Sequence, residues 1–174
     1  AKNGVELAID EINALGGIQF ELNAKDDAND EEKAVNAYNS LKDWGMQAMI
    51  GAVTTTPCIA VASEAYRDRI FCLTPSASST EVTEGKDNVF QLCFTDPNQG
   101  TASARYIQEH MPNAKIAVIY DNSSAYSTGI YHNFAAEAKT LGLNVVSETT
   151  CNADTVDYTV QLDDARNNGA DLVF

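Results

Sequence analysis

Three short segments of this sequence carry side chains suited to binding a small polar molecule, and each follows a strand-like apolar run. They are residues 54–56 (three threonines), residues 76–79 (Ser-Ala-Ser-Ser) and residues 121–126, which end in a tyrosine. In parallel α/β sheets, ligands bind beyond the carboxyl ends of the strands, in the loops that lead into helices. Hydroxyl groups beside the free N–H groups of a helix start suit a carboxylate or another small anion. The first loop therefore predicts recognition of such a group. In the second loop, small side chains leave room for a ligand and expose backbone amides.

Each loop also has an ordinary structural explanation. Threonine is a good N-cap residue, so residues 54–56 can simply begin a helix that has Pro57 in its first turn. Residues 76–79 can form a common serine-rich turn. In the third loop Tyr126 can cover an apolar group and Asp121 can hold an amine, but an exposed loop tyrosine is equally ordinary. The residues alone leave these alternatives open.

No catalytic set accompanies the loops. There is no GxGxxG motif after a strand, no Walker lysine motif and no GxSxG elbow; Gly16 and Gly17 end a predicted helix instead. His110 and His132 fall on predicted helices, so a Ser/His/Asp triad has no base at a strand end. We therefore expect a binding protein with no catalytic residues and no cofactor, not an enzyme.

Cysteine spacing argues against a metal site, and net charge argues against a nucleic-acid partner. The four cysteines, at positions 58, 72, 93 and 151, show no CxxC or other metal-ligand spacing, so we expect no metal site. Lysine and arginine number 11 against 25 acidic residues, a net charge of −14. That field repels a polyanion and no basic cluster offsets it, so we expect no nucleic-acid partner.

Apolar residues alternate between helical and strand spacing along the chain. The pattern predicts a first helix ended by Gly16 and Gly17, a second that begins at Asp30, and a last one capped by Thr155. A buried strand is expected over residues 49–53. The other predicted strands span residues 18–22, 70–73, 115–120, 143–146 and 171–174. This βα order indicates an α/β fold with parallel sheets covered by helices on both faces.

Several segments, taken in order, resemble the extracellular solute-binding proteins of branched-chain amino-acid ABC transporters, the Leu/Ile/Val-binding family. The resemblance covers nearly the whole chain. It rests on GVELAIDEIN over residues 4–13 with the following glycine pair, on TPSAS over residues 74–78, on KIAVIYD over residues 115–121, and on Asp157-Tyr158. Each segment is a weak signal, but their joint order is typical of type I periplasmic binding proteins.

The resemblance implies a two-lobed type I periplasmic-binding-protein fold, in which parallel sheets flanked by helices close over a ligand. Family members are about twice as long as this chain, so we expect a fragment of both lobes. Residues 1–95 would form the first lobe without its first strand, and residues 96–174 the first part of the second lobe.

The resemblance also implies roles for particular residues. In the family, the ligand carboxylate is held by a hydroxyl of the first loop and by amides and a hydroxyl of the second, and an aromatic side chain comes from the second lobe. The matching ligand-binding positions here are Thr55, Ser76, Ala77, Ser78 and Tyr126, and the adjacent Thr54 is expected to line the same pocket. A cysteine pair of the family is not reproduced, because Asn29 and Thr54 stand where those cysteines are expected.

The implied function is that of an ABC-transporter receptor, which captures an amino acid, branched-chain by default, and delivers it to a membrane permease. Such a receptor is extracellular or periplasmic, with a lipoprotein anchor at the membrane surface as an option. The alternative is a ligand-sensing domain of a receptor or transcription regulator in the same superfamily.

Overall fold

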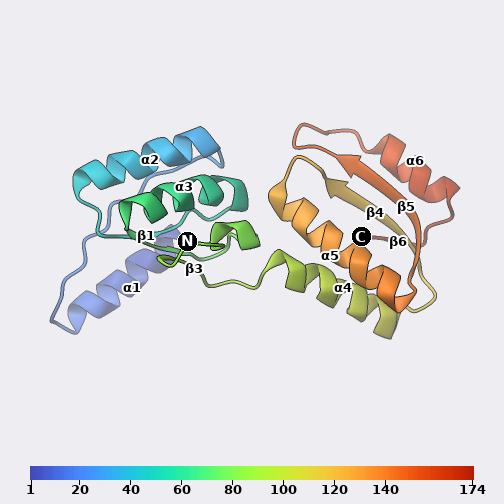
Figure 1. The fold of residues 1–174 in the computed structure, drawn as a ribbon, viewed down its shortest axis with the longest axis horizontal. Coiled ribbons are helices and arrows are strands. Elements are labelled where there is room, and N and C mark those ends of the chain that lie inside the picture. The colour runs from blue at the N-terminus through green and yellow to red at the C-terminus, as the bar shows by residue number, and fades with distance from the viewer. The chain divides into compact units, whose positions relative to one another are not determined.

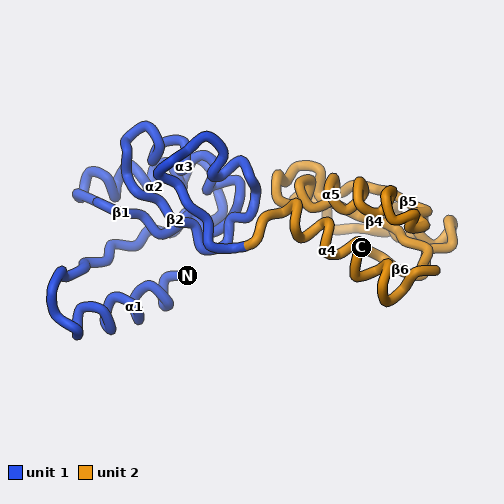
Figure 2. Tube along the Cα trace, turned by 60° about the horizontal axis from the view of Figure 1, so that its bottom comes forward, with its two compact units in different colours: residues 1–93 blue, residues 94–174 orange.

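Strands and helices alternate along the chain in the computed structural model, which describes residues 1–174 (Figure 1). The chain divides into two units, Ala1–Cys93 and Phe94–Phe174 (Figure 2). Each unit contains one three-stranded sheet in which every strand pairing is parallel. The α/β class expected from the sequence is therefore confirmed.

The first unit has a sheet in the strand order β1-β2-β3. Ile50 of β1 lies opposite Leu73 of β2, and Thr74 of β2 lies opposite Gln91 of β3. In both views α1 lies on the opposite side of these strands from α2 and α3 (Figures 1 and 2). The elements are α1 (Lys2–Ala14), α2 (Glu31–Trp44), β1 (Ala48–Ile50), α3 (Thr55–Asp68), β2 (Phe71–Thr74), the 3-10 helix η1 (Thr80–Val82) and β3 (Val89–Gln91).

The second unit has the strand order β5-β4-β6. Its longest pairing is between β4 and β5, which are parallel and are connected in the chain by helix α5. Its core holds the buried side chains of Ile116, Val118 and Phe134. The elements are α4 (Asp96–His110), β4 (Lys115–Asp121), α5 (Ala125–Leu141), β5 (Asn144–Cys151), α6 (Thr159–Asn167) and β6 (Leu172–Val173).

Local signals mark the start of α2, which the sequence predicts at Asp30, and the end of α5. Asp30 precedes α2, and its Oδ1 accepts a hydrogen bond from the Lys33 N–H at 2.8 Å. Glu31 and Glu32 follow in the first turn, where their charge complements the helix dipole. Gly142 ends α5 with φ of 70°, a left-handed conformation that glycine adopts without a Cβ clash.

Two other expectations are wrong. Residues 18–22 form no strand: the Phe20 N–H donates to Asn13 Oδ1, and Asn13 Nδ2 donates to the Phe20 carbonyl, both at 2.8 Å. A side-chain amide thus satisfies the groups that a neighbouring strand would otherwise bond. Thr155 does not cap α6, because its hydroxyl contacts Asn152, while Asp157 Oδ1 accepts from the Thr159 N–H at 2.9 Å.

The strand predicted over residues 49–53 is shorter and less buried than expected. It ends at Ile50, which is 46% exposed. The sheet is covered unevenly. Cys72 and Val89 are buried in the core with α2 and α3, whereas Phe71 and Phe90 stack on each other and are exposed.

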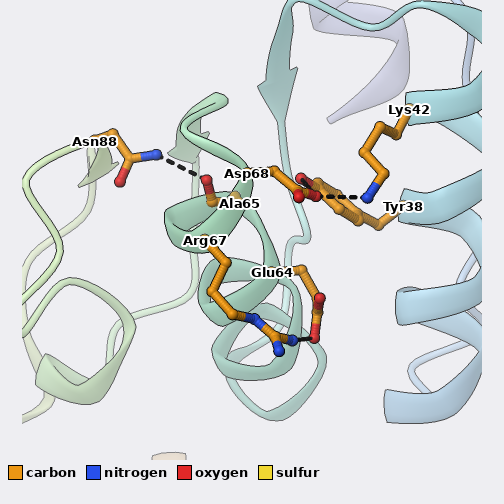
Figure 3. Close-up of polar contacts among 7 residues, drawn as sticks. All are labelled: Tyr38, Lys42, Glu64, Ala65, Arg67, Asp68 and Asn88. Carbon is orange, nitrogen blue, oxygen red and sulfur yellow. Dashed lines mark hydrogen bonds and ion pairs between the residues drawn. The ribbon is translucent and has the colours of Figure 1, made fainter.

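A polar cluster joins α2 to the end of α3 (Figure 3). Asp68 Oδ2 accepts hydrogen bonds from the buried Tyr38 hydroxyl at 2.9 Å and from Lys42 Nζ at 2.7 Å. These two bonds lower the pKa of Asp68. Burial, and then the neighbouring Asp68 carboxylate, raise the pKa of Tyr38, so its hydroxyl stays protonated and can donate.

We expect the Asp68→Asn variant to lose stability in a pH-dependent way. A carboxylate whose pKa is lowered by folding stabilises the protein above its unfolded value of 3.8, and this contribution disappears as the pH falls through the folded value. The difference in unfolding free energy between wild type and variant should therefore be full at pH 6 and shrink toward pH 2. Urea denaturation at several pH values measures it. The control is Asp43→Asn, which removes an exposed carboxylate of α2 and should destabilise the protein less than Asp68→Asn does at pH 6.

Helices α4 and α5 approach each other at Gly100. A Cβ built on Gly100 would lie 2.7 Å from the Phe134 N atom and 3.1 Å from the Asn133 Cβ, and it would also collide with the Ile130 carbonyl oxygen. Backbone atoms cannot yield as a flexible side chain can. The close packing of these two helices therefore depends on the absence of a side chain at position 100.

We expect Gly100→Ala to destabilise the protein by about 1–3 kcal/mol through overpacking. Gly4→Ala is the matched control, because nothing lies within 4 Å of a Cβ at that position in α1. There the added methyl group should be neutral or should stabilise by about 0.5–1 kcal/mol. Thermal melting of both variants checks the pair, and equal effects at the two sites would contradict this account of the α4–α5 contact.

Candidate functional site

The amino end of α3 is the first part of the candidate site. Thr54 precedes the helix, but its side chain makes no capping hydrogen bond; its hydroxyl donates to Asn29 Oδ1 at 2.7 Å. Thr55 is the first residue of α3 and is only 6% exposed. The N–H groups of the first turn have no partner within a helix and carry a partial positive charge. The simple capping role is thus wrong for Thr54, and this helix start can still attract an anion.

The loop after β2 is the second part. Ser76 is exposed at the surface, whereas Ala77 and Ser78 are buried. The Ser78 N–H points to Thr55 Oγ1 at 3.4 Å, a long hydrogen bond. Two residues that are 23 positions apart in the chain therefore meet, and they come from the two loops that the sequence selected. A threonine hydroxyl that accepts from an N–H keeps its own hydrogen for a further acceptor.

Thr74, the last residue of β2, organises this loop, and the sequence patterns did not select it. Its Oγ1 donates to the Ala52 carbonyl at 2.7 Å and accepts from the Ala77 N–H at 3.0 Å. Cys93 Sγ donates to the Ala77 carbonyl at 3.4 Å. A hydroxyl residue that ends an apolar strand directly before a proline was the available signal.

The positions that the resemblance assigns to a cysteine pair lie in contact. Asn29 stands in the segment before α2 with φ of 57°, and Thr54 bonds to it. The hydrogen bond thus links the two chain segments at the place where family members are expected to have a covalent link. Hydrogen bonding there contributes less than a disulfide typically does.

Tyr126, the remaining ligand-binding candidate, belongs to the second unit. It is 43% exposed and is the second residue of α5, which begins at Ala125. The expectation that Tyr126 ends a loop is therefore wrong, because the helix starts two residues earlier than the sequence indicates. Ser124 caps this helix by accepting from the Ser127 N–H at 3.4 Å. Asp121 accepts from the Ser123 N–H at 2.8 Å and from its hydroxyl at 2.6 Å, so this carboxylate holds its own turn.

Buried thiols lie behind the two loops of the first unit. Burial raises the pKa of Cys58 to about 11, although hydrogen bonds with Thr74 and with the Ala52 backbone act in the opposite direction. Burial also raises the pKa of Cys72 to about 12, and Cys72 Sγ donates to the Gly51 carbonyl at 3.3 Å. Both thiols are therefore protonated at neutral pH and serve as packing groups and weak donors.

The fold and this arrangement define a class. Two parallel α/β units in tandem match the fold of type I binding proteins. The chain belongs to the periplasmic binding protein family, whose model matches residues 1–174. No helix of the structure combines the length and the apolar character that crossing a bilayer requires.

Relatives of known sequence or structure agree with this membership. The Leu/Ile/Val-binding protein homolog 3 of Brucella melitensis is 30% identical over 99% of this chain and 48% of its own length. The chain thus spans about half the length of the curated relatives it matches. Among solved structures, the leucine binding protein LivK of Thermotoga maritima is 27% identical with a TM-score of 0.91, over 98% of this chain and 49% of that one.

A second solved structure is the branched-chain amino acid transporter substrate binding protein LivJ of Streptococcus pneumoniae, in complex with isoleucine. It is 28% identical and has a TM-score of 0.90, over 99% of this chain and 50% of that one. The resemblance found in the sequence is therefore confirmed at the level of the family and the fold.

We expect Cys58 and Cys72 to resist alkylation in the native protein. Their raised pKa values and their burial leave almost no accessible thiolate at pH 8, whereas Cys151 is partly exposed. Iodoacetamide labelling followed by peptide mass spectrometry should modify Cys151 first, and should reach the other two only in urea. Rapid native labelling of Cys58 would show that the loops in front of it open readily.

Proposed function

We propose that the protein carrying this chain is the solute-binding receptor of an ABC transporter. It captures an amino acid, branched-chain by default, outside the cytoplasmic membrane and delivers it to the membrane permease. A lipid anchor is one way of holding such a receptor at the membrane. The proposal is supported by membership of the periplasmic binding protein family and by relatives named for binding leucine, isoleucine and valine.

The observation that carries the proposal is the meeting of Thr55 and Ser78. The hydroxyl of Thr55 and the backbone N–H of Ser78 lie 3.4 Å apart, at the start of α3 and at the carboxyl end of β2. The hydroxyl and the N–H can each donate a hydrogen bond to a carboxylate, and the dipole of α3 also favours a negative charge at the start of this helix. Because this hydrogen bond is long, it can yield to a stronger charged acceptor at little cost.

We assign the ligand's carboxylate to the Thr55 hydroxyl and to the backbone N–H and hydroxyl of Ser78. Ser76 and Ala77 shape the loop that presents these donors, because their own N–H groups bond to Thr74 Oγ1. Thr54 lies at the rim, where its bond to Asn29 holds it beside the helix start. Tyr126 stays a proposed ligand-binding residue, because its half-exposed ring can cover an apolar side chain. All six ligand-binding candidates of the sequence thus keep a place in the proposal.

An amino-acid carboxylate must approach a protein of strongly negative net charge. Local donors decide this binding more than net charge does, because exposed charges beyond about 10 Å are largely screened at physiological salt. The charged amine of a zwitterionic ligand also reduces the long-range repulsion. A simple anion lacks that compensation, so an amino acid suits this site better than a simple anion does.

We expect Thr55→Val to weaken amino-acid binding by about 1–3 kcal/mol, because a carboxylate loses one hydrogen bond from a buried hydroxyl. Valine keeps the β-branched shape, so the packing at the start of α3 should persist. Isothermal titration of the full-length protein against a panel of amino acids gives the affinities.

Thr56→Val is the matched control, since Thr56 is the next residue of the same helical turn but its side chain is exposed. It should bind as the wild type does. If no amino acid binds to the wild type, the proposed receptor function is wrong. If binding occurs but Thr55→Val leaves it unchanged, the carboxylate lies elsewhere.

A further inference from the structure

We infer that Thr74 is a positioning residue, which holds the two loops of the proposed carboxylate site in register through its hydroxyl group. The inference rests on the proposed function and extends it to a residue that does not touch the ligand. Thr74 has 0% of its surface exposed, so it acts only through the groups that it bonds.

The hydroxyl of Thr74 bonds to groups of both loops. Its one hydrogen goes to the Ala52 carbonyl at 2.7 Å, and its lone pairs accept from the Ala77 N–H at 3.0 Å and the Ser76 N–H at 3.4 Å. Ala52 belongs to the segment that leads from β1 into α3, and Ser76 and Ala77 belong to the loop after β2. One buried oxygen atom therefore joins both halves of the proposed site.

The bonded groups are those that set the direction of the donors. Ala77 is held at both ends, because its N–H bonds to Thr74 and its carbonyl accepts from Cys93 Sγ. The Ser78 N–H that follows points to Thr55. A rotation of the Ala77 peptide groups would turn this N–H away from Thr55. Affinity for a small carboxylate depends on such prior alignment, because a mobile donor must be ordered on binding.

Removal of the hydroxyl alone should loosen the loop and leave the strand intact. Thr74→Val has the same branched shape, but the Ala52 carbonyl and the Ala77 N–H lose their partner in a buried position. These groups can recover a partner only if the loop shifts toward water. Thr74→Ser keeps the hydroxyl and lacks only a methyl group, so it should preserve the alignment.

The test uses the full-length protein with L-leucine as the probe, in isothermal titrations of the wild type, Thr74→Val and Thr74→Ser. We expect the valine variant to bind about tenfold more weakly, and the serine variant to stay within about threefold of the wild type. Ser147→Ala is the matched control for general destabilisation. Ser147 is a buried hydroxyl on β5 that donates to Asp164 at 2.5 Å, and its loss should lower the melting temperature without changing affinity.

Hydrogen exchange of the ligand-free proteins distinguishes positioning of the loop from a general contribution to stability, because it measures the opening of individual backbone amides. In Thr74→Val the backbone amide of Ala77 should exchange faster relative to the amides of β2, whereas in Ser147→Ala this ratio should stay as in the wild type. Rescue of both affinity and exchange by serine would identify the hydroxyl as the cause.

The possible outcomes separate the two proposals. If the wild type binds no amino acid, the proposed function fails, and the inference fails with it as a statement about binding. If the wild type binds leucine and Thr74→Val binds equally well with unchanged exchange at Ala77, only the inference is overturned. If the valine variant does not fold, Thr74→Ser decides, because a serine variant with tenfold weaker binding would show that the methyl group, not the hydroxyl, matters.

Discussion

Parallel pairing of the strands is the constraint on which the rest of this structure depends. Parallel neighbours end at the same edge of a sheet, so the loops that follow β1 and β2 are brought side by side although α3 separates them in the chain. The register places Ile50 opposite Leu73. From those two residues the chain reaches Thr55 and Ser78 within five positions. A shift of the register by one residue would separate these groups and turn the buried Cys72 to the opposite face.

The same edge concentrates polar groups that the core cannot tolerate unpaired. Thr74 and Thr55 are buried, and each hydroxyl has a backbone partner from a different loop. Buried polar groups that are fully bonded stiffen the region around them, because each broken bond leaves an unsatisfied group. A loop held in this way can present its remaining donors to a ligand without being ordered at the moment of binding, which favours recognition of a small molecule.

Much of the fold could be predicted from the sequence, because its helices carry strong local signals. Asp30 with two following glutamates begins α2, and Gly142 ends α5. The predictions failed where local pattern and long-range pairing compete. Phe20 lies in an alternating apolar run, but its backbone bonds to the side chain of Asn13. Thr155 has a good capping side chain, yet it bonds to a nearby asparagine in a turn.

The sequence by itself determined the α/β alternation, the family resemblance and the two hydroxyl-bearing loops. These follow from apolar periodicity and from short motifs, each of which lies within one stretch of the chain. Only the tertiary structure decided that Thr55 meets Ser78, that Thr54 bonds to Asn29, and that Thr74 joins the two loops. Those contacts join residues far apart in the chain. Their geometry is set by strand register and by burial, and neither is encoded in any one segment of the sequence.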